Sequence, residues 1–214
     1  MPSYTEDTVF NVANYLVWQV TEDEAHFLER VNLDAKAIIR YKSIKGDKRR
    51  VEWLAGRYVV GQILDDTDTL IVIDDCGKPH IKGSELYMSL SHSHGYVVGL
   101  VAPRLCGIDI QLMVPKITRI AHKFINQNER ESITPANELA YLHIYWSAKE
   151  ALYKAYGKRS LDFKKNILIE PLTSLEESGI FKGKIIKDDF EQKYTLQYDF
   201  IDEHVLVTAI ETNI

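Results

Sequence analysis

The alternation of apolar and polar residues divides the chain into strands and helices in an irregular order. Runs of β-branched and aromatic residues predict strands, whereas apolar residues three or four positions apart predict helices. The expected strands are 10–20, 70–74, 86–90, 96–102, 105–112, 167–170, 179–186, 194–201 and 205–211. The expected helices are 21–31, 47–64, 117–124 and 137–156. Because these elements do not follow a regular βαβ alternation, we expect an α+β fold.

Particular residues predict where the helices begin and end. Thr21 followed by Glu24 is a capping-box pattern, which predicts the start of a short helix. Asp47 and Asn137 are suited to cap the two long helices, and Gly157 is suited to end the second one.

Composition adds mainly exclusions. The 214 residues are 45% apolar, which is enough for a core, and both halves contain a helix and several strands. We therefore expect an N-terminal half, 1–103, and a C-terminal half, 104–214, with a seam near Pro103.

No apolar run is long enough to cross a membrane, and residues 1–10 lack the basic start of a signal peptide. The net charge of -5 argues against a nucleic-acid partner.

Two cysteines, Cys76 and Cys106, stand in no metal or redox spacing. We therefore expect no disulfide framework, and we expect the protein to be in the reducing cytoplasm.

The segment Gly107-Ile108-Asp109-Ile110-Gln111 is the first candidate for chemistry. Strand alternation sends Asp109 and Gln111 to one face, and Mg²⁺ prefers oxygen ligands of these types. The alternative interpretation is a strand with one solvated face.

The helix segment 146–155 is the second candidate, because Glu150 and Lys154 lie opposite its apolar stripe. They are either a surface pair of the common i,i+4 kind or a metal-binding carboxylate beside a phosphate-binding ammonium.

The polar segment 91–95, Ser-His-Ser-His-Gly, is the third candidate. Its hydroxyls, imidazoles and backbone N–H groups can hold a phosphate, although a plain hairpin turn has the same composition. His92 and His94 could instead form an H-x-H metal pair, as in a metallohydrolase, but the other histidines are scattered.

Arginines at 50 and 57, with Trp53 between them, lie on one edge of the first long helix and are suited to phosphate contact. A Gly77-Lys78-Pro79 turn follows them along the chain. A solvated helix edge and an ordinary turn are the alternatives.

Taken in order, these pieces resemble the Sfp-type 4′-phosphopantetheinyl transferases. The matching segments are Ala55-Gly56-Arg57, Gly77-Lys78-Pro79, Leu90-Ser91-His92-Ser93, Gly107-Ile108-Asp109-Ile110-Gln111, Ala121-His122-Lys123-Phe124 with Glu129, and Trp146-Ser147-Ala148-Lys149-Glu150 with Lys154. They extend from Ala55 to Gly157. The resemblance implies two similar halves with the active site in the cleft between them.

The resemblance also implies coenzyme A as donor, a Mg²⁺ ion and a serine of an apo acyl or peptidyl carrier protein as acceptor, with release of 3′,5′-ADP. The implied coenzyme A contacts are Arg50, Arg57, Gly77, Lys78, Pro79, Ser91, His92, Asp109, Lys149 and Lys154. The implied metal ligands are Asp109, Gln111 and Glu150, and the implied catalytic residues are Glu150, as the base, and Lys154.

The sequence departs from the family at two positions. Gln111 stands where bacterial members commonly have Glu, and Ser89 stands where Asn is more usual. Gln111 therefore leaves a second hypothesis open, in which the chain is a catalytically silent module that binds coenzyme A or a nucleotide. Because one chain is expected to complete one site, we expect a monomer.

Overall fold

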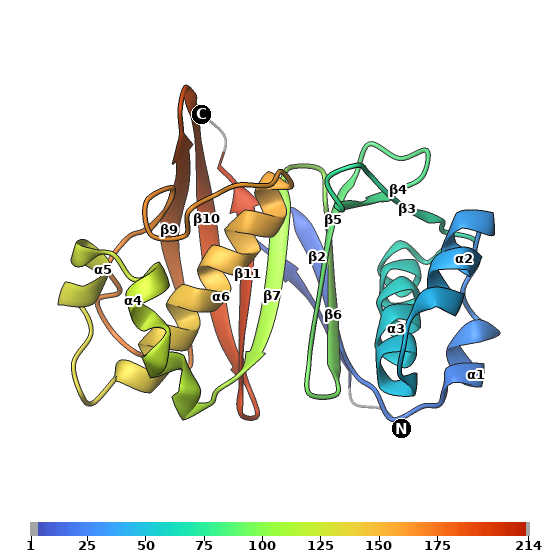
Figure 1. The fold of residues 1–214 in the computed structure, drawn as a ribbon, viewed down its shortest axis with the longest axis horizontal. Coiled ribbons are helices and arrows are strands. Elements are labelled where there is room, and N and C mark those ends of the chain that lie inside the picture. The colour runs from blue at the N-terminus through green and yellow to red at the C-terminus, as the bar shows by residue number, and fades with distance from the viewer. Residues whose placement is uncertain (1–3, 213–214) are drawn as a thin grey trace. The chain divides into compact units, whose positions relative to one another are not determined.

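The computed structural model describes residues 4–212 and divides into two compact units, Met1–Pro103 and Arg104–Ile214. Each unit combines antiparallel strands with helices, so the fold is of the expected α+β class (Figure 1). No helix within residues 4–212 is both long and apolar enough to cross a membrane.

The first unit is built on a four-stranded antiparallel sheet. Its strand order is β1 (Tyr4–Val9), β2 (Ala13–Gln19), β6 (Tyr96–Ala102) and β5 (Tyr87–Ser93). A separate hairpin contains β3 (Ile71–Ile73) and β4 (Pro79–Ile81). The helices are α1 (Glu24–Leu28), α2 (Ala35–Ser43) and α3 (Asp47–Leu64). Buried residues of α3, among them Leu54 and Val59, pack against Leu16 and Val97 of the sheet.

Several predicted boundaries in the first unit are wrong for local reasons. The strand expected from residue 10 begins at Ala13, because Phe10 and Asn11 have φ values of 52° and 54° and form a turn. The cap of α1 is Asp23, which accepts a hydrogen bond from His26 N, rather than Thr21. At α3 the N-cap is Gly46, whose φ of 92° suits glycine, rather than Asp47.

The second unit is built on a five-stranded antiparallel sheet. Its strand order is β7 (Cys106–Leu112), β11 (His204–Glu211), β10 (Phe190–Ile201), β9 (Ser178–Lys187) and β8 (Ile167–Ile169). The helical segments are η1 (Pro115–Arg119), α4 (Ala121–Phe124), α5 (Gln127–Glu131) and α6 (Glu138–Tyr156). Helix α6 lies along β7 and β11, as Figure 1 shows.

Helix α6 ends as predicted at Gly157, which has a left-handed φ of 69°. Its predicted cap is only half right, because Asn137 is the N-cap residue but its side chain accepts no capping hydrogen bond from a backbone N–H of the helix. The Asn137 side chain instead accepts a hydrogen bond from Thr134 N. The single helix expected over 117–124 is a 3₁₀ turn followed by a short α-helix, with Ile120 between them.

Candidate functional site

Strand β7 and helix α6 of the second unit bring three of the predicted residues together. Ile108 and Ile110 are fully buried on one face of β7, and Asp109 and Gln111 alternate with them as expected. Asp109 is only 2% exposed, however, so this is not a solvated strand face. A buried carboxylate needs partners, and α6 supplies one.

Gly107 explains how closely the strand approaches the helix. A Cβ placed on Gly107 would lie 1.9 Å from the backbone oxygen of Ala151 in α6 and 3.1 Å from the nitrogen of Ala155. Any other residue would therefore push β7 away from α6. Glycine at this position therefore allows the backbone of α6 to approach the strand closely.

Lys154 is the partner of Asp109. Its ammonium nitrogen lies 2.7 Å from Asp109 Oδ1 and donates a hydrogen bond of 2.9 Å to the Ile108 carbonyl. The Gln111 amide donates to the other carboxylate oxygen, Asp109 Oδ2, at 3.2 Å. Lys154 thus binds across to the strand, and the alternative of a simple surface pair between Glu150 and Lys154 is wrong.

Glu150 is the second carboxylate of this cluster. Burial raises the pKa of Glu150 to about 7, the charge of Asp109 acts in the same direction, and Lys154 opposes it. No hydrogen bond to the Glu150 carboxylate forms among the residues that the structure describes. Glu150 lies in the wall of a cavity of about 590 Å³, which is lined by Ile120, Lys123, Phe124, Trp146, Glu150, Tyr153, Leu161 and Phe163.

The donor set of this cluster fits a Mg²⁺ ion. Within residues 4–212, no three His, Cys, Asp or Glu side chains converge. Asp109 and Glu150 are close enough for their charges to interact, and the Gln111 amide lies beside Asp109. Mg²⁺ is commonly held by one or two carboxylates together with waters and substrate phosphates. The charges of the two neighbouring acids also repel each other, and a cation relieves that repulsion.

Lys149 does not join this cluster. Its side chain is 0% exposed, and its ammonium lies 2.9 Å from Glu129 Oε1. It also donates to the carbonyls of Phe124 at 2.7 Å and Phe163 at 2.9 Å. Three acceptors match the three N–H bonds of a lysine, so the predicted contact with phosphate is not available in this structure. Burial lowers the pKa of Lys149, and Glu129 opposes that shift.

A cavity of about 540 Å³ in the first unit contains other predicted residues. Arg57, Pro79, Ser91 and His92 line it. Trp53, which the sequence placed between Arg50 and Arg57, also lines it. The sequence did not identify three further lining residues, Arg40, Arg49 and Glu52, as parts of this site. The basic character of the 42–50 segment was the available signal for Arg49, whereas helix α2, which carries Arg40, was not predicted.

The cavity of the first unit presents positive charge above an aromatic ring. The Arg57 guanidinium lies 3.3 Å from the centroid of the Trp53 ring, and burial lowers the pKa of Arg57 to about 10. His92 Nδ1 lies 3.3 Å from Glu52 Oε2. Ser91 and His92 belong to strand β5, because the turn is only His94–Gly95, with φ values of 44° and 93°.

Three of the predicted coenzyme A contacts in the first unit lie outside the lining of this cavity. Arg50 is held by Glu24, at 2.8 Å, and by Asp47, at 2.7 Å. Gly77 and Lys78 form the turn between β3 and β4, where the Lys78 backbone N–H donates to Asp74 Oδ1 at 2.8 Å.

The H-x-H interpretation is also unsupported. His92 contacts Glu52, whereas His94 Nδ1 lies 3.3 Å from Ser93 Oγ, so the two imidazoles have different partners.

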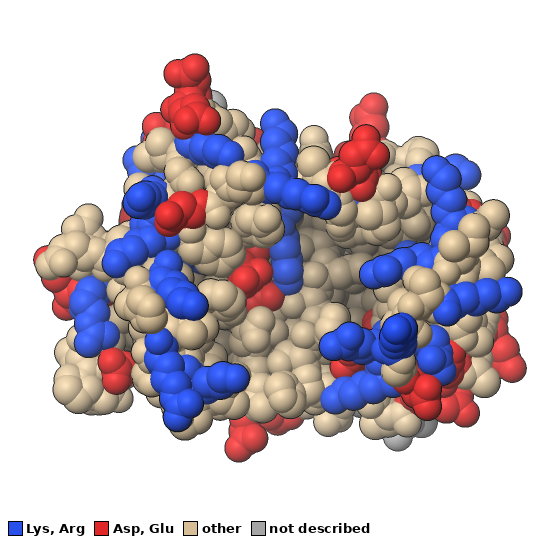
Figure 2. Space-filling view, viewed as in Figure 1, with Lys and Arg blue, Asp and Glu red and all other residues tan. Residues whose placement is uncertain are grey.

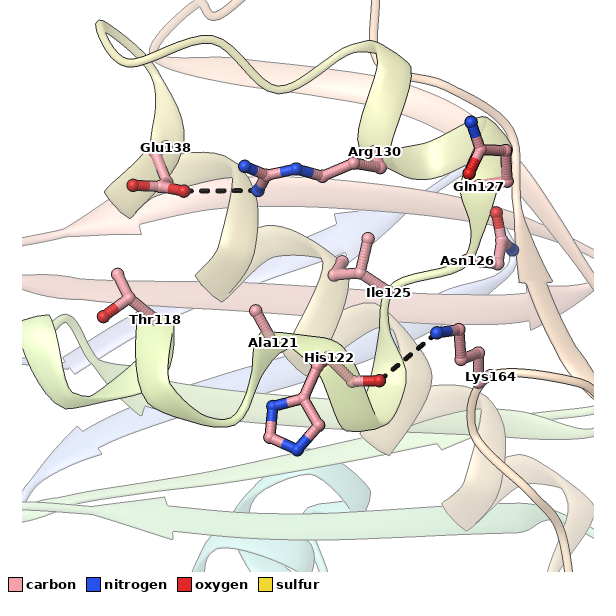
Figure 3. Close-up of a pocket in the computed structure, with 9 residues that line it drawn as sticks. All are labelled: Thr118, Ala121, His122, Ile125, Asn126, Gln127, Arg130, Glu138 and Lys164. Carbon is pink, nitrogen blue, oxygen red and sulfur yellow. Dashed lines mark hydrogen bonds and ion pairs between the residues drawn. The ribbon is translucent and has the colours of Figure 1, made fainter.

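A further cavity of about 390 Å³ in the second unit was not predicted (Figure 3). Two contacts shape it: Lys164 donates to the His122 carbonyl at 3.3 Å, and Arg130 pairs with Glu138 at 3.2 Å. The nine lining residues include none of the predicted ligand contacts.

Comparison with known proteins points to one family. Residues 105–209 match the family described as the 4′-phosphopantetheinyl transferase superfamily. A 4′-phosphopantetheinyl transferase of Bacillus subtilis is 30% identical over 99 residues, 44% of each chain. The transferase gsp of Aneurinibacillus migulanus is 28% identical over 130 residues, 58% of this chain and 54% of that protein. The transferase psf-1 of Bacillus pumilus is 37% identical over 86 residues, 38% of this chain and 37% of that protein. The chain therefore spans about half the length of the curated relatives it matches, and the resemblance predicted from the motifs is confirmed.

Proposed function

Residues 105–209 of the chain belong to the 4′-phosphopantetheinyl transferase superfamily, and from this premise we propose that the chain moves the phosphopantetheine arm of coenzyme A to a serine of an apo acyl or peptidyl carrier protein. The observation that supports this most is the cluster of buried Asp109 with the partly exposed Lys154 and Glu150, which lies inside the matched region. It combines two carboxylates suited to a hard cation with an ammonium suited to phosphate.

In the proposed reaction, the serine oxygen attacks the β-phosphorus of coenzyme A. A bond forms between that oxygen and phosphorus, the bond from phosphorus to the bridging oxygen breaks, and 3′,5′-ADP leaves. Glu150 is the proposed base for the serine proton, either directly or through a metal-bound water, because serine is a weak nucleophile that needs a base. Lys154 would stabilise the charge that develops on the phosphate oxygens.

Asp109 and Glu150, with Gln111, are the proposed ligands of Mg²⁺. The ion would supply charge that offsets the pyrophosphate and its leaving oxygen. Gln111 can contribute only a neutral carbonyl oxygen, and in this structure its amide nitrogen faces Asp109.

In the first unit, the cavity beside Arg57 is the proposed contact for the adenosine end of coenzyme A. Arg57, Ser91 and His92 would contact its phosphates, in particular the 3′-phosphate, and Pro79 would lie near the adenine. The stacked Arg57 and Trp53 provide a cationic and an aromatic surface side by side.

The carrier protein is the proposed macromolecular partner, and we propose a monomeric, cytoplasmic enzyme with no membrane or nucleic-acid partner. Lys116, Arg119 and Lys123 are exposed on η1 and α4, where Figure 2 shows Lys and Arg side chains gathered. This basic patch suits an acidic carrier surface. Neither Cys76 nor Cys106 is in a disulfide bond, as a reducing compartment would allow.

One observation favours the alternative of a silent coenzyme A-binding module. Both oxygens of Asp109 are already engaged, by Lys154 and by Gln111. Incubation of the protein with coenzyme A, Mg²⁺ and an apo carrier protein, followed by mass spectrometry of the carrier, separates the two functions. Transfer adds one phosphopantetheine to the carrier, whereas the silent module binds coenzyme A without transfer. In the second case, restored transfer in Gln111→Glu would identify Gln111 as the cause.

A further inference from the structure

Lys149 is a fully buried lysine for which the proposed reaction has no direct use. It precedes Glu150 on α6, yet its ammonium contacts Glu129, Phe124 O and Phe163 O rather than the Asp109 cluster. A buried charge of this kind is costly unless it is paired and fully hydrogen-bonded, and here it is both.

Glu129 connects Lys149 to two further segments. Its side chain is 0% exposed, and Oε2 accepts a hydrogen bond from Asn126 N as part of the capping box of α5. Oε1 accepts one from Ile169 N of the edge strand β8, at 3.1 Å. Lys149 therefore ties α6 to α5 and β8 through one carboxylate.

The two carbonyl partners of Lys149 belong to residues whose rings build the cavity around Glu150. The Phe124 ring lies 5.1 Å from the Trp146 ring, and the Phe163 ring lies 5.6 Å from it. Phe163 also lies 5.5 Å from Tyr153. All four rings line the same cavity as Glu150. By holding two backbone carbonyls, Lys149 fixes two walls that come from outside α6.

We propose that Lys149 is a positioning residue. It holds the C-terminal end of α4, at Phe124, and the loop that contains Phe163 against α6, and so fixes the shape of the cavity that Glu150 lines. The proposal rests on the proposed transferase function for its kinetic consequences only. It replaces the phosphate contact that the motif implied for Lys149.

The test uses two variants: the single variant Lys149→Met, and a double variant that combines Lys149→Met with Glu129→Gln. The single variant leaves a buried carboxylate without its cation, which is destabilising. The double variant removes that unpaired charge, so its stability should recover in part, while the two carbonyls still lose their donor. Recovery is incomplete because glutamine has one acceptor oxygen for the two backbone N–H groups of Asn126 and Ile169. Tyr145→Phe is the matched control, because Tyr145 on the same helix also ties two segments through a buried polar atom, bonding Ser132 Oγ at 2.7 Å and Leu172 N at 3.0 Å.

Hydrogen exchange measured by mass spectrometry provides a readout that is independent of activity. In the double variant, exchange should become faster in peptides that cover 119–126 and 158–166. In Tyr145→Phe it should become faster around 132–137 and 170–175 instead. The Mg²⁺ concentration for half-maximal transfer should rise about ten-fold or more in the double variant, as is typical when partners that orient metal ligands are lost. It should be unchanged in Tyr145→Phe, and the KM for coenzyme A should be unchanged in both.

Three results would overturn the proposal. A raised KM for coenzyme A, with normal exchange and Mg²⁺ requirement, would make Lys149 a phosphate contact after all. Parent-like exchange and kinetics in the double variant would remove any positioning role. A double variant that does not fold would show that the network serves the fold alone. If the parent itself transfers nothing, the proposed function fails, while the exchange measurement still decides whether Lys149 holds these walls.

Discussion

Replacing Glu150 by Gln should stabilise the protein at pH 8 when no divalent cation is present. In the folded chain, burial and the charge of Asp109 raise the pKa of Glu150 from 4.5 to about 7. Between these two values the folded state keeps a proton that the unfolded state has released. Stability must therefore fall as the pH rises through this window, and it levels off above pH 7. Glutamine carries no charge at any of these pH values and avoids the loss.

The expected size follows from the shift. Each pKa unit corresponds to about 1.4 kcal/mol, so a shift from 4.5 to about 7 corresponds to a loss of about 3 kcal/mol between pH 4.5 and pH 8. The side chain is mostly buried, so solvent screening reduces this figure only in part. Glu150→Gln should recover most of it at pH 8 and almost none at pH 4.5.

Urea unfolding followed by circular dichroism, at several pH values between 5 and 8 in the presence of EDTA, measures this difference. Glu138→Gln is the control, because it removes a carboxylate from the partly exposed first turn of the same helix. The control should change the free energy of unfolding by a similar amount at each pH. Added Mg²⁺ should stabilise the parent more than Glu150→Gln, because binding to the folded state alone raises stability.

A parent and a Glu150→Gln variant with the same pH dependence between pH 5 and 8 would refute the reasoning. That result would mean that Glu150 is ionised at little cost in the folded, metal-free protein.

Three further predictions concern the packing, the first cavity and the departure from the family. Gly107→Ala should lower the free energy of unfolding by about 3 kcal/mol or more, measured by urea unfolding, because the new Cβ would overlap the backbone of α6. Arg57→Ala and His92→Ala should raise the KM for coenzyme A much more than that for 3′-dephospho-coenzyme A; equal effects would show that neither residue reads the 3′-phosphate. In a Mg²⁺ titration of the transfer rate, Gln111→Ala should lose far less activity than Asp109→Ala, and equal losses would make Gln111 a central ligand.

The sequence predicted elements best where a strong local pattern defined both ends. Residues 96–102 are a strand with the predicted bounds, and the second long helix ends at Gly157 as expected. Helix α2 was missed: it has only nine residues, and Ala37 is the only one of them that is buried. Its start depends on Asp34, whose side chain accepts a hydrogen bond from Ala37 N.

The sequence was enough to predict which residues belong to the candidate site, but not which atoms those residues contact. Spacing along α6 showed that Glu150 and Lys154 share a face, but it could not show that Lys154 reaches Asp109 on β7. The lysines at 149 and 154 are equally polar in the sequence, yet one is completely buried and the other is part of the cluster. Which acceptors surround a lysine depends on segments far away along the chain, here Glu129 and Phe163.

The charges of the cluster balance only while Glu150 is protonated. Asp109 and Lys154 form one neutral pair at 2.7 Å, and a neutral Glu150 beside them adds no charge to a buried region. When Glu150 ionises, the region carries one uncompensated negative charge, which a divalent cation on Asp109 and Glu150 would more than offset. Loss of the Glu150 proton and occupation of the cluster by a cation therefore favour each other. A glutamate at position 111 would add a second uncompensated charge, whereas Gln111 keeps the metal-free cluster close to neutral and donates a hydrogen bond to Asp109. The departure from the family is thus consistent with a cluster that is stable without its cation and binds it less tightly.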